Sequence, residues 1–539
     1  MPPKSTTSLT VKQAVLELLR SVGIKKVFGN PGSTELPFLS DWPDDIDYVL
    51  ALQEASAVGM ADGYAQATRN AGFVNLHSAA GVGNALGNIY TAHRNQTPLV
   101  ITAGQQARSI LPLQAFLYAE RAAEFPRPYV KFSVEPARAE DVPAAIARAY
   151  QVAMQPPCGP TFVSIPIDDW THPAQPVLPR EVSRELGPAP AAMRELATAL
   201  DKSECPAFIV GPAVDRAEAV ELMVRVAEKA KASVWVSPFS ARCSFPERHP
   251  QFSGFLPASP GQLSEALRSH DLVVVIGAPV FTFHVEGHAS IFDGATTLFQ
   301  ITEDADAAAM TPVGNSIIAT MKPALTMLLE LLGETGRAAP QGRKLPPPPA
   351  AADPIPVDFL LHTLSLAMGE AAALVEEAPS HRPIMHQFMP MPGADSFYTM
   401  ASGGLGFSLP ASVGMALGRP NRRTVCLIGD GSAMYSIQAL WTAAQRKLPL
   451  TVVVINNSGY GAMRSFSQVM QVRNVPGLDL PGIDFVKLAE GQGCRAVRVA
   501  RSAELAPALK QALAHEGASL VEVMVDSAVP LLYAHRGRT

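Results

Sequence analysis

The sequence predicts an α/β protein made of three doubly wound domains, each with a central parallel sheet. Three observations predict this fold class. The chain has 539 residues, about twice the length at which a single hydrophobic core usually stops growing. Short apolar stretches alternate with helix-like stretches along most of the chain, as in repeated strand and helix units. Two proline-rich stretches, 171–190 and 336–356, divide this alternation into three parts.

We assign residues 1–175 to the first domain. Thr10 and Gln13 form a capping-box pattern with apolar residues after it at helical spacing, so a helix is expected to begin here. Apolar stretches then predict strands, each of which ends in Gly, Ser, Asn or His before a helix-like stretch. These strands are expected at 26–28, 48–52, 72–76, 99–103 and 161–165. In a parallel sheet of this kind, functional loops gather at the carboxyl ends of the strands.

The second and third domains repeat this pattern. We assign 190–335 to a middle α/β domain, 336–356 to a connector and 357–539 to a C-terminal domain. The connector contains the run Pro346 to Pro349, which cannot be helical or lie inside a sheet. Strands are expected at 207–210, 233–236, 272–276 and 297–301 in the middle domain, and at 373–375, 424–428, 451–455 and 520–525 in the C-terminal domain.

The composition is that of a globular protein and excludes several classes. The net charge is −5 and no Lys or Arg cluster is large, so nucleic acid is not an expected partner. The N-terminus lacks the apolar core of a secretory signal and no apolar run could span a bilayer, so we expect a cytoplasmic protein without membrane association. The cysteines lack paired spacing, so neither disulfides nor a zinc site are expected at Cys158, Cys205, Cys243, Cys426 or Cys494.

The strongest chemical signal lies in the third domain. Gly429-Asp430-Gly431-Ser432 follows one expected strand, and Asn457 follows the next. Asp430 and Asn457 are 27 positions apart, the length of one strand-helix-strand crossover, so both can emerge at the same sheet edge. A carboxylate and an amide there are suitable ligands for Mg²⁺ or Ca²⁺, and Gly431 and Ser432 allow backbone N–H groups to approach a phosphate. An ordinary turn would explain Gly-Asp-Gly alone, but the spacing favours a metal-bridged diphosphate.

Glu54 is a candidate functional acid in the first domain. It follows an expected strand and leads into a helix with small residues, including Gly59 and Gly63, on nearly every turn. A glutamate at this position could simply cap the helix, because the N-terminal dipole stabilises acidic groups. The small residues instead suggest close packing of helix on helix, in which a carboxylate would be desolvated and its pKa raised.

Together these motifs resemble the thiamine-diphosphate-dependent decarboxylases and synthases, and the resemblance covers nearly the whole chain. It implies that the first domain binds the pyrimidine ring of the coenzyme and that the third binds its diphosphate. Glu54 would be the acid that hydrogen-bonds the pyrimidine ring. The implied metal ligands are Asp430, Asn457 and the main-chain oxygen of Gly459.

The resemblance also assigns roles around the Gly-rich stretch from Ser402 to Pro410, which on its own could be an ordinary loop. Leu405 would force the coenzyme into its bent conformation, and the Gly403 carbonyl would accept a hydrogen bond from the pyrimidine amine. Further implied coenzyme-binding residues are Ser380, Gly431, Ser432, Tyr460 and Gly461.

Within this family, three sequence blocks resemble the benzoylformate decarboxylase branch most closely. They are Phe28 to Ser33, Asn75 to Asn84 and Ile276 to His284. The resemblance implies that Ser33 hydrogen-bonds the substrate carboxylate, that His77 protonates the developing alkoxide, and that His284 protonates the carbon that has lost CO₂. Histidine suits both proton transfers because its pKa lies near neutrality.

The segment from Glu376 to Arg382 departs from this branch. Pro379 and His381 replace hydroxyl-bearing residues near the diphosphate, and Thr399 stands where an aromatic residue is expected beside the substrate. These differences leave the implied coenzyme contacts in place and bear on the choice of substrate. Candidate walls of the substrate pocket, which could equally be core residues, are Phe116, Leu117, Pro379, Thr399, Met463 and Phe466.

The expected function is the non-oxidative decarboxylation of an aromatic 2-keto acid, similar to benzoylformate, to an aldehyde and CO₂. A carboligase or lyase that acts on 2-hydroxyketones is one alternative, although the Ser33 and His77 blocks count against it. A non-catalytic nucleotide-binding scaffold is another, but no Gly-x-Gly-x-x-Gly follows the first strand. The family also implies a homo-oligomer, at least a dimer and by expectation a tetramer, with coenzyme sites between chains.

Overall fold

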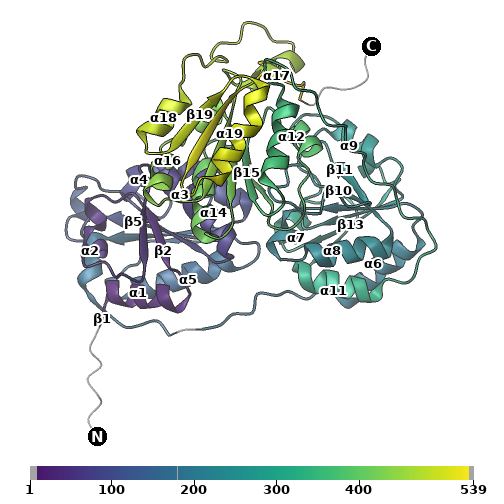
Figure 1. Cartoon of the computed structure of the whole chain (residues 1–539). Helices are drawn as coiled ribbons and strands as arrows, with labels where there is room; N and C mark the ends of the chain where they lie inside the picture. Colours follow the sequence, from purple (N-terminus) through teal and green to yellow (C-terminus); the bar gives the residue numbers. More distant parts are fainter. Residues whose placement is uncertain (1–8, 179, 533–539) are drawn as a thin grey trace.

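A computed structural model describes residues 9–178 and 180–532 of the chain. It contains three six-stranded sheets, in which every pair of neighbouring strands is parallel. In Figure 1 the N-terminal domain (purple) and the middle domain (teal) lie side by side, and the C-terminal domain (green to yellow) lies above both. The expected fold class is confirmed. In the described part of the chain, no helix has the length and apolar character needed to cross a membrane.

The N-terminal sheet has the order β3-β2-β4-β5-β7-β6. Its strands are β2 Lys26–Gly29, β3 Asp47–Leu50, β4 Gly72–Leu76, β5 Leu99–Gln105, β6 Ser133–Val134 and β7 Pro160–Pro166. The helices are α1 Val11–Ser21, α2 Leu36–Leu39, α3 Glu54–Thr68, α4 Ser78–Asn95 and α5 Val142–Met154. The expected capping box begins α1, since Gln13 N donates to Thr10 Oγ1 at 3.2 Å and Thr10 N donates to Gln13 Oε1 at 2.9 Å. β1 Leu9–Thr10 pairs antiparallel with β8 Pro173–Ala174, so the expected linker begins later than residue 171.

The middle sheet has the order β11-β10-β9-β12-β13-β14. Its strands are β9 Pro206–Val210, β10 Ser233–Val236, β11 Phe252–Phe255, β12 Leu272–Ile276, β13 Thr297–Thr302 and β14 Asn315–Ile318. The helices are α6 Pro190–Lys202, α7 Pro212–Arg216, α8 Val220–Ala230, α9 Pro260–Leu267, α10 Ala305–Ala309 and α11 Met321–Leu331. No helix lies between α11 and residue 357, as expected for the proline-rich connector, and Arg343 N donates to Phe252 O at 2.8 Å to hold the connector on this domain.

The C-terminal sheet has the order β16-β15-β17-β18-β20-β19. Its strands are β15 Ala373–Glu377, β16 Phe397–Thr399, β17 Thr424–Gly429, β18 Leu450–Asn456, β19 Arg495–Val499 and β20 Ser519–Met524. The helices are α12 Val357–Met368, α13 Arg382–Phe388, α14 Ser408–Gly418, α15 Asp430–Ala433, α16 Ala439–Gln445, α17 Gly461–Val469, α18 Phe485–Gly491 and α19 Ser502–Ala514.

Helices α3 and α14 cross at very short distance because small residues face each other. A Cβ atom on Gly63 would lie 1.9 Å from the main-chain oxygen of Ala411, and one on Gly414 would lie 1.8 Å from that of Met60. The close helix packing expected from the small residues of α3 is therefore confirmed. The crossing joins the N- and C-terminal domains, whose buried apolar residues form one continuous cluster, whereas the middle domain has its own core.

Each sheet contains an inner point at which the strand order reverses: between β2 and β4, between β9 and β12, and between β15 and β17. Loops that leave the carboxyl ends of strands at such a reversal run to opposite faces of the sheet and leave a crevice between them. Ser33 and His77 follow β2 and β4, His284 follows β12, and Asp430 follows β17. The fold therefore places the candidate residues at the positions where parallel sheets usually bind ligands.

Candidate active site

A cavity of about 590 Å³ is lined by residues of both the middle and the C-terminal domains. Its volume is in the range of cofactor and small-molecule sites. Most of the residues singled out from the sequence line it: His284, Pro379, Ser380, Gly403, Leu405, Asp430, Gly431, Ser432, Asn457, Gly459, Tyr460, Gly461, Met463 and Phe466.

Asp430 and Asn457 follow neighbouring strands, β17 and β18, and provide oxygen atoms to this cavity. The Asp430 carboxylate accepts hydrogen bonds from the amides of Gly431 at 2.8 Å and Gly459 at 2.9 Å. Burial raises the pKa of Asp430, because a desolvated carboxylate is costly unless a positive charge compensates it. Asn457 Oδ1 is buried and accepts no hydrogen bond from any described residue. This oxygen set suits a hard divalent cation.

The possible metal ligands beside Asp430 are not all charged side chains. In residues 9–178 and 180–532, no group of three or more His, Cys, Asp or Glu side chains could hold a metal ion. A cation bound beside Asp430 would therefore depend on one carboxylate together with amide and main-chain oxygens.

Glycines leave room beside these oxygens. A Cβ atom on Gly431 would lie 2.6 Å from Tyr460 Cε1, and one on Gly461 would lie 2.7 Å from Asn457 Nδ2. The Gly461 Cβ position is also 2.9 Å from Ser380 Oγ. The hydroxyl of Ser380 therefore lies at the first turn of α17, next to Asn457, where a phosphate could contact both the hydroxyl and main-chain amides.

The Gly-rich loop at 402–407 is held by a residue that the sequence analysis did not single out. Glu377, at the end of β15, is fully buried and accepts hydrogen bonds from the amides of residues 406–408 at 2.7 to 2.9 Å. Burial raises the pKa of Glu377 to about 7, against the opposite effect of these donors. A carboxylate at the end of a buried strand was the signal that could have identified it. The loop contains Gly403, whose φ of 75° favours glycine.

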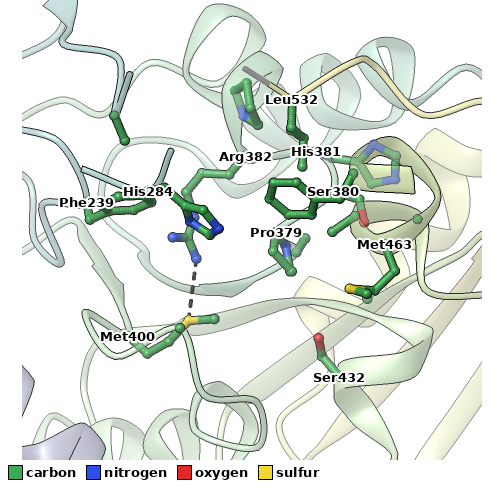
Figure 2. Close-up of a pocket in the computed structure, with 18 of the residues that line it drawn as sticks. Phe239, His284, Pro379, Ser380, His381, Arg382, Met400, Ser432, Met463 and Leu532 are labelled. Atoms are coloured by element: carbon green, nitrogen blue, oxygen red, sulfur yellow. Dashed lines mark hydrogen bonds between the residues drawn. The ribbon is translucent and has the colours of Figure 1, made fainter. Parts of the chain in front are cut away.

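His284 reaches the cavity from the middle domain. Its ring stacks on Phe466 of α17, with ring centroids 5.1 Å apart and an interplanar angle of 18°. The centroid of Phe239, also from the middle domain, is 6.0 Å from that of His284. In Figure 2, His284 and Phe239 lie on one side of the cavity, and Ser380 and Ser432 lie on the other. The histidine thus faces the C-terminal domain across the cavity.

His77 and the segment that carries Ser33 lie together on the N-terminal domain. Gly32 lies against the histidine ring, since a Cβ atom there would be 2.2 Å from His77 Nδ1. His77 Nδ1 is 2.9 Å from Glu35 Oε2 and 3.0 Å from Thr34 Oγ1. Glu35 is almost wholly buried and was not anticipated from the sequence. An acidic residue two positions after the Phe28–Ser33 block was the available signal.

Glu54 begins α3 but does not cap it. Gln53 takes that position, and its side chain accepts from the Ser56 amide at 3.0 Å. Asn84 Nδ2 donates to Glu54 Oε2 at 3.1 Å. Glu54 is half-exposed in the single chain. The packing of α3 on α14 alone therefore does not produce the desolvation that we expected for this carboxylate, because Glu54 lies at the open end of the helix.

The structure divides the sequence candidates other than Thr399 into two groups. One group lines the cavity, and the other lies on the N-terminal domain and does not line it: Ser33, Glu54, His77, Phe116 and Leu117. Phe116 is 88% exposed in the single chain, so it is not a core residue, and it does not line the cavity of its own chain. One chain by itself does not bring the acid Glu54 or the histidine His77 into the cavity.

The expectation that Thr399 forms a wall of the cavity is wrong. Thr399 is 1% exposed, its hydroxyl donates to Glu376 O at 2.8 Å, and it accepts from Arg382 Nη2 at 2.7 Å. Arg382, to which the sequence analysis gave no role, lines the cavity instead. His381 also lines it, and its two ring nitrogens have no hydrogen-bond partner among the described residues. Burial lowers the pKa of His381 to about 4.

Comparison with known proteins identifies the family. Three domain models of the thiamine pyrophosphate enzymes match the chain: the N-terminal TPP binding domain at residues 9–122, the central domain at 193–328 and the C-terminal TPP binding domain at 378–523. Benzoylformate decarboxylase from Pseudomonas aeruginosa is 43% identical over 528 residues, which cover 97% of this chain and 100% of that protein. The chain belongs to the thiamine pyrophosphate enzyme family.

Solved structures of this family are similar along nearly the whole chain. The crystal structure of benzoylformate decarboxylase from Polynucleobacter necessarius has a TM-score of 0.94 and 41% identity, and the match covers 97% of this chain and 100% of that one. The 4-hydroxybenzoylformate decarboxylase from Rhodococcus jostii has a TM-score of 0.93 and 40% identity, with 96% and 100% coverage.

The cavity fits the coenzyme of the thiamine pyrophosphate enzymes. The buried Asn457 Oδ1 without a partner and the desolvated Asp430 suit a cation that would bridge a diphosphate. Gly431 and Gly461 keep side chains away from the same region. The N-terminal TPP binding domain contributes its candidate residues from a separate surface.

Proposed function

We propose that the chain is a thiamine-diphosphate-dependent decarboxylase that converts an aromatic 2-keto acid to the aldehyde and CO₂. One observation carries the proposal: the cavity that contains the diphosphate motif of Asp430 and Asn457 also receives His284 from the middle domain. The identity of 43% to a benzoylformate decarboxylase over its full length supports this reaction class.

Bound thiamine diphosphate supplies the carbon nucleophile and takes up the electrons released with CO₂. Asp430, Asn457 and the Gly459 carbonyl would hold Mg²⁺ or Ca²⁺, so that the cation offsets the buried carboxylate. Gly403 and Leu405 would contact the rings of the coenzyme. The diphosphate would be held by Ser380, Gly431, Ser432, Tyr460 and Gly461.

The remaining candidate residues transfer protons or form hydrogen bonds to the coenzyme and the substrate. Glu54 donates a hydrogen bond to the pyrimidine ring, and Ser33 donates one to the substrate carboxylate. His77, held by Glu35, delivers a proton to the keto oxygen. His284 delivers a proton to the carbon that has lost CO₂.

We further propose that the chain works as a homo-oligomer, a dimer at least and a tetramer by expectation. This proposal is supported by the observation that, within one chain, Glu54 and His77 do not line the cavity. In a dimer, these residues of one subunit would close the cavity of the other. We also propose the domain boundaries 1–175, 190–335 and 357–539, because each of these ranges contains one complete six-stranded sheet.

The experiment is a turnover assay of the purified chain with thiamine diphosphate and Mg²⁺. We expect benzaldehyde and CO₂ from benzoylformate, and neither product from the Asn457→Ala variant. If the coenzyme binds calorimetrically but no aromatic 2-keto acid is decarboxylated, the proposal is wrong. If benzoin or free aldehydes react faster than any keto acid, the chain is instead a lyase or carboligase.

A further inference from the structure

The cavity contains one strong cation, in the segment where the sequence departs from the benzoylformate decarboxylase branch. Among the described residues that line the cavity, Arg382 is the only arginine or lysine. It begins α13, directly after the segment that contains Pro379 and Ser380. Its side chain is 21% exposed, so it is accessible from the cavity but mostly enclosed by protein.

Three contacts fix the guanidinium in one orientation. Arg382 Nε donates to Glu376 Oε2 at 2.7 Å, and Nη2 donates to Thr399 Oγ1 at 2.7 Å and to Met400 Sδ at 3.4 Å. Glu376 is fully buried, and Thr399 also donates to its main-chain oxygen. A guanidinium held by two of its three nitrogens loses little further entropy when it binds a ligand, because its fork is already ordered.

The hydrogen bonds that Arg382 makes to described residues come from Nε and Nη2, which leaves Nη1 to donate to a ligand. Figure 2 shows Arg382 extended toward Met400 and away from Ser380 and Ser432, which lie near the diphosphate motif. The guanidinium therefore belongs to the substrate side of the cavity. Apolar side chains, including Phe239, Phe466 and Met400, form much of the surrounding wall.

Two differences from the expected pattern, at Thr399 and Arg382, are in direct contact. Thr399 occupies the position where the family resemblance leads us to expect an aromatic side chain beside the substrate, and its small hydroxyl binds Arg382. The cavity wall, where an aromatic side chain is expected, therefore presents the guanidinium of Arg382 as a hydrogen-bond donor. Because Glu376 already balances the charge of Arg382, the pair suits a neutral acceptor better than a second carboxylate.

We propose that Arg382 determines substrate specificity by donating a hydrogen bond from Nη1 to an oxygen substituent on the aromatic ring of the substrate. The preferred substrates are therefore ring-hydroxylated 2-keto acids rather than unsubstituted or alkylated ones. This inference rests on the proposed decarboxylation and extends it to the substrate class. Glu376 and Thr399 are positioning residues, which act through Arg382.

The test compares 4-hydroxybenzoylformate with 4-methylbenzoylformate, whose methyl group has a similar size but accepts no hydrogen bond. For the holoenzyme, we expect kcat/KM to be roughly tenfold to hundredfold higher for the hydroxyl compound, the range for a hydrogen bond from a charged donor. The ratio should fall to near one in the double variant Arg382→Gln with Glu376→Gln, which leaves no unpaired buried charge. Arg382→Lys should retain part of the ratio, and Gln387→Ala, an exposed change on the same helix, should retain all of it.

A binding measurement separates this inference from the proposed function. The two corresponding 2-hydroxy acids, 4-hydroxymandelate and 4-methylmandelate, cannot be decarboxylated in the same way, and calorimetry with the holoenzyme should show the same preference and its loss in the double variant. A ratio near one in the unmodified enzyme, or an unchanged ratio in the double variant, overturns the inference. Equal losses for both substrates also overturn it, because they would place Arg382 on the carboxylate. Absence of turnover with every aromatic keto acid is instead the failure of the proposed function.

Discussion

Glu35 Oε2 lies 2.9 Å from His77 Nδ1, and Glu35 Oε1 accepts from the Gly104 amide at 3.0 Å. The carboxylate therefore ties the histidine ring to the neighbouring strand β5. This contact leaves the opposite nitrogen, Nε2, as the one that can exchange a proton with a substrate, since Nδ1 is engaged by Glu35.

We predict that Glu35→Gln lowers kcat for an aromatic 2-keto acid by roughly a hundredfold, because a misdirected histidine transfers protons poorly. The dissociation constant for thiamine diphosphate should not change, since Glu35 lies outside the coenzyme cavity. Steady-state kinetics and calorimetry measure the two quantities. Glu17→Gln, an exposed change in the same domain, is the control. A parallel loss of coenzyme affinity would show that Glu35 has only a structural role.

A divalent cation should control coenzyme binding through Asp430 and Asn457. We predict that EDTA abolishes calorimetric binding of thiamine diphosphate and that Mg²⁺ or Ca²⁺ restores it. Thiamine diphosphate at a hundred times its dissociation constant should stabilise the protein by about 2.7 kcal/mol, but only with the metal present. The Asn457→Ala variant should lose this stabilisation. Metal-independent binding of the coenzyme would contradict the assigned ligands.

Glu377 predicts a pH dependence of stability. Its pKa in the folded protein is about 7, raised from 4.5, so the folded state retains a proton that the unfolded state releases. The stabilisation is complete below pH 4.5 and is lost as the pH rises to about 7, by at most ~3 kcal/mol. Denaturant unfolding of the apoprotein should therefore show a smaller decrease over this window for Glu377→Gln than for the exposed control Glu221→Gln. Equal slopes would mean that Glu377 is ionised throughout, held by its three amide donors.

Two inactive variants should complement each other if subunits share sites. Glu54→Gln alters the N-terminal domain, and Asn457→Ala alters the cavity. We predict that each variant alone is inactive and that their co-expression restores activity, because a mixed dimer contains one site with both residues intact. Light scattering should show at least a dimer. Continued inactivity of an isolated mixed dimer would place all catalytic residues within one chain.

Much of the fold could be predicted because buried strands leave a clear pattern. Strands β4, β5, β9, β12, β17 and β18 were expected within a few residues of their observed bounds. In the three six-stranded sheets, five strands were missed, and all lie at sheet edges: β6, β11, β14, β16 and β19. An edge strand has a neighbour on one side only and buries less surface, so its sequence need not be apolar. Arg495–Val499, with mostly exposed residues, is an example.

The sequence by itself determined the three-domain α/β architecture and the residues whose types define the chemistry, such as Asp430, Asn457, Glu54 and His77. Those signals are local, because each motif follows one strand. Only the tertiary structure decided that Glu35 orients His77, that Glu377 holds the Gly-rich loop and that Arg382 replaces Thr399 at the cavity wall. These contacts join residues far apart in the chain, and their partners depend on which strands become neighbours in the folded sheets. The same folding separated Glu54 from the cavity, and no local motif carries that information.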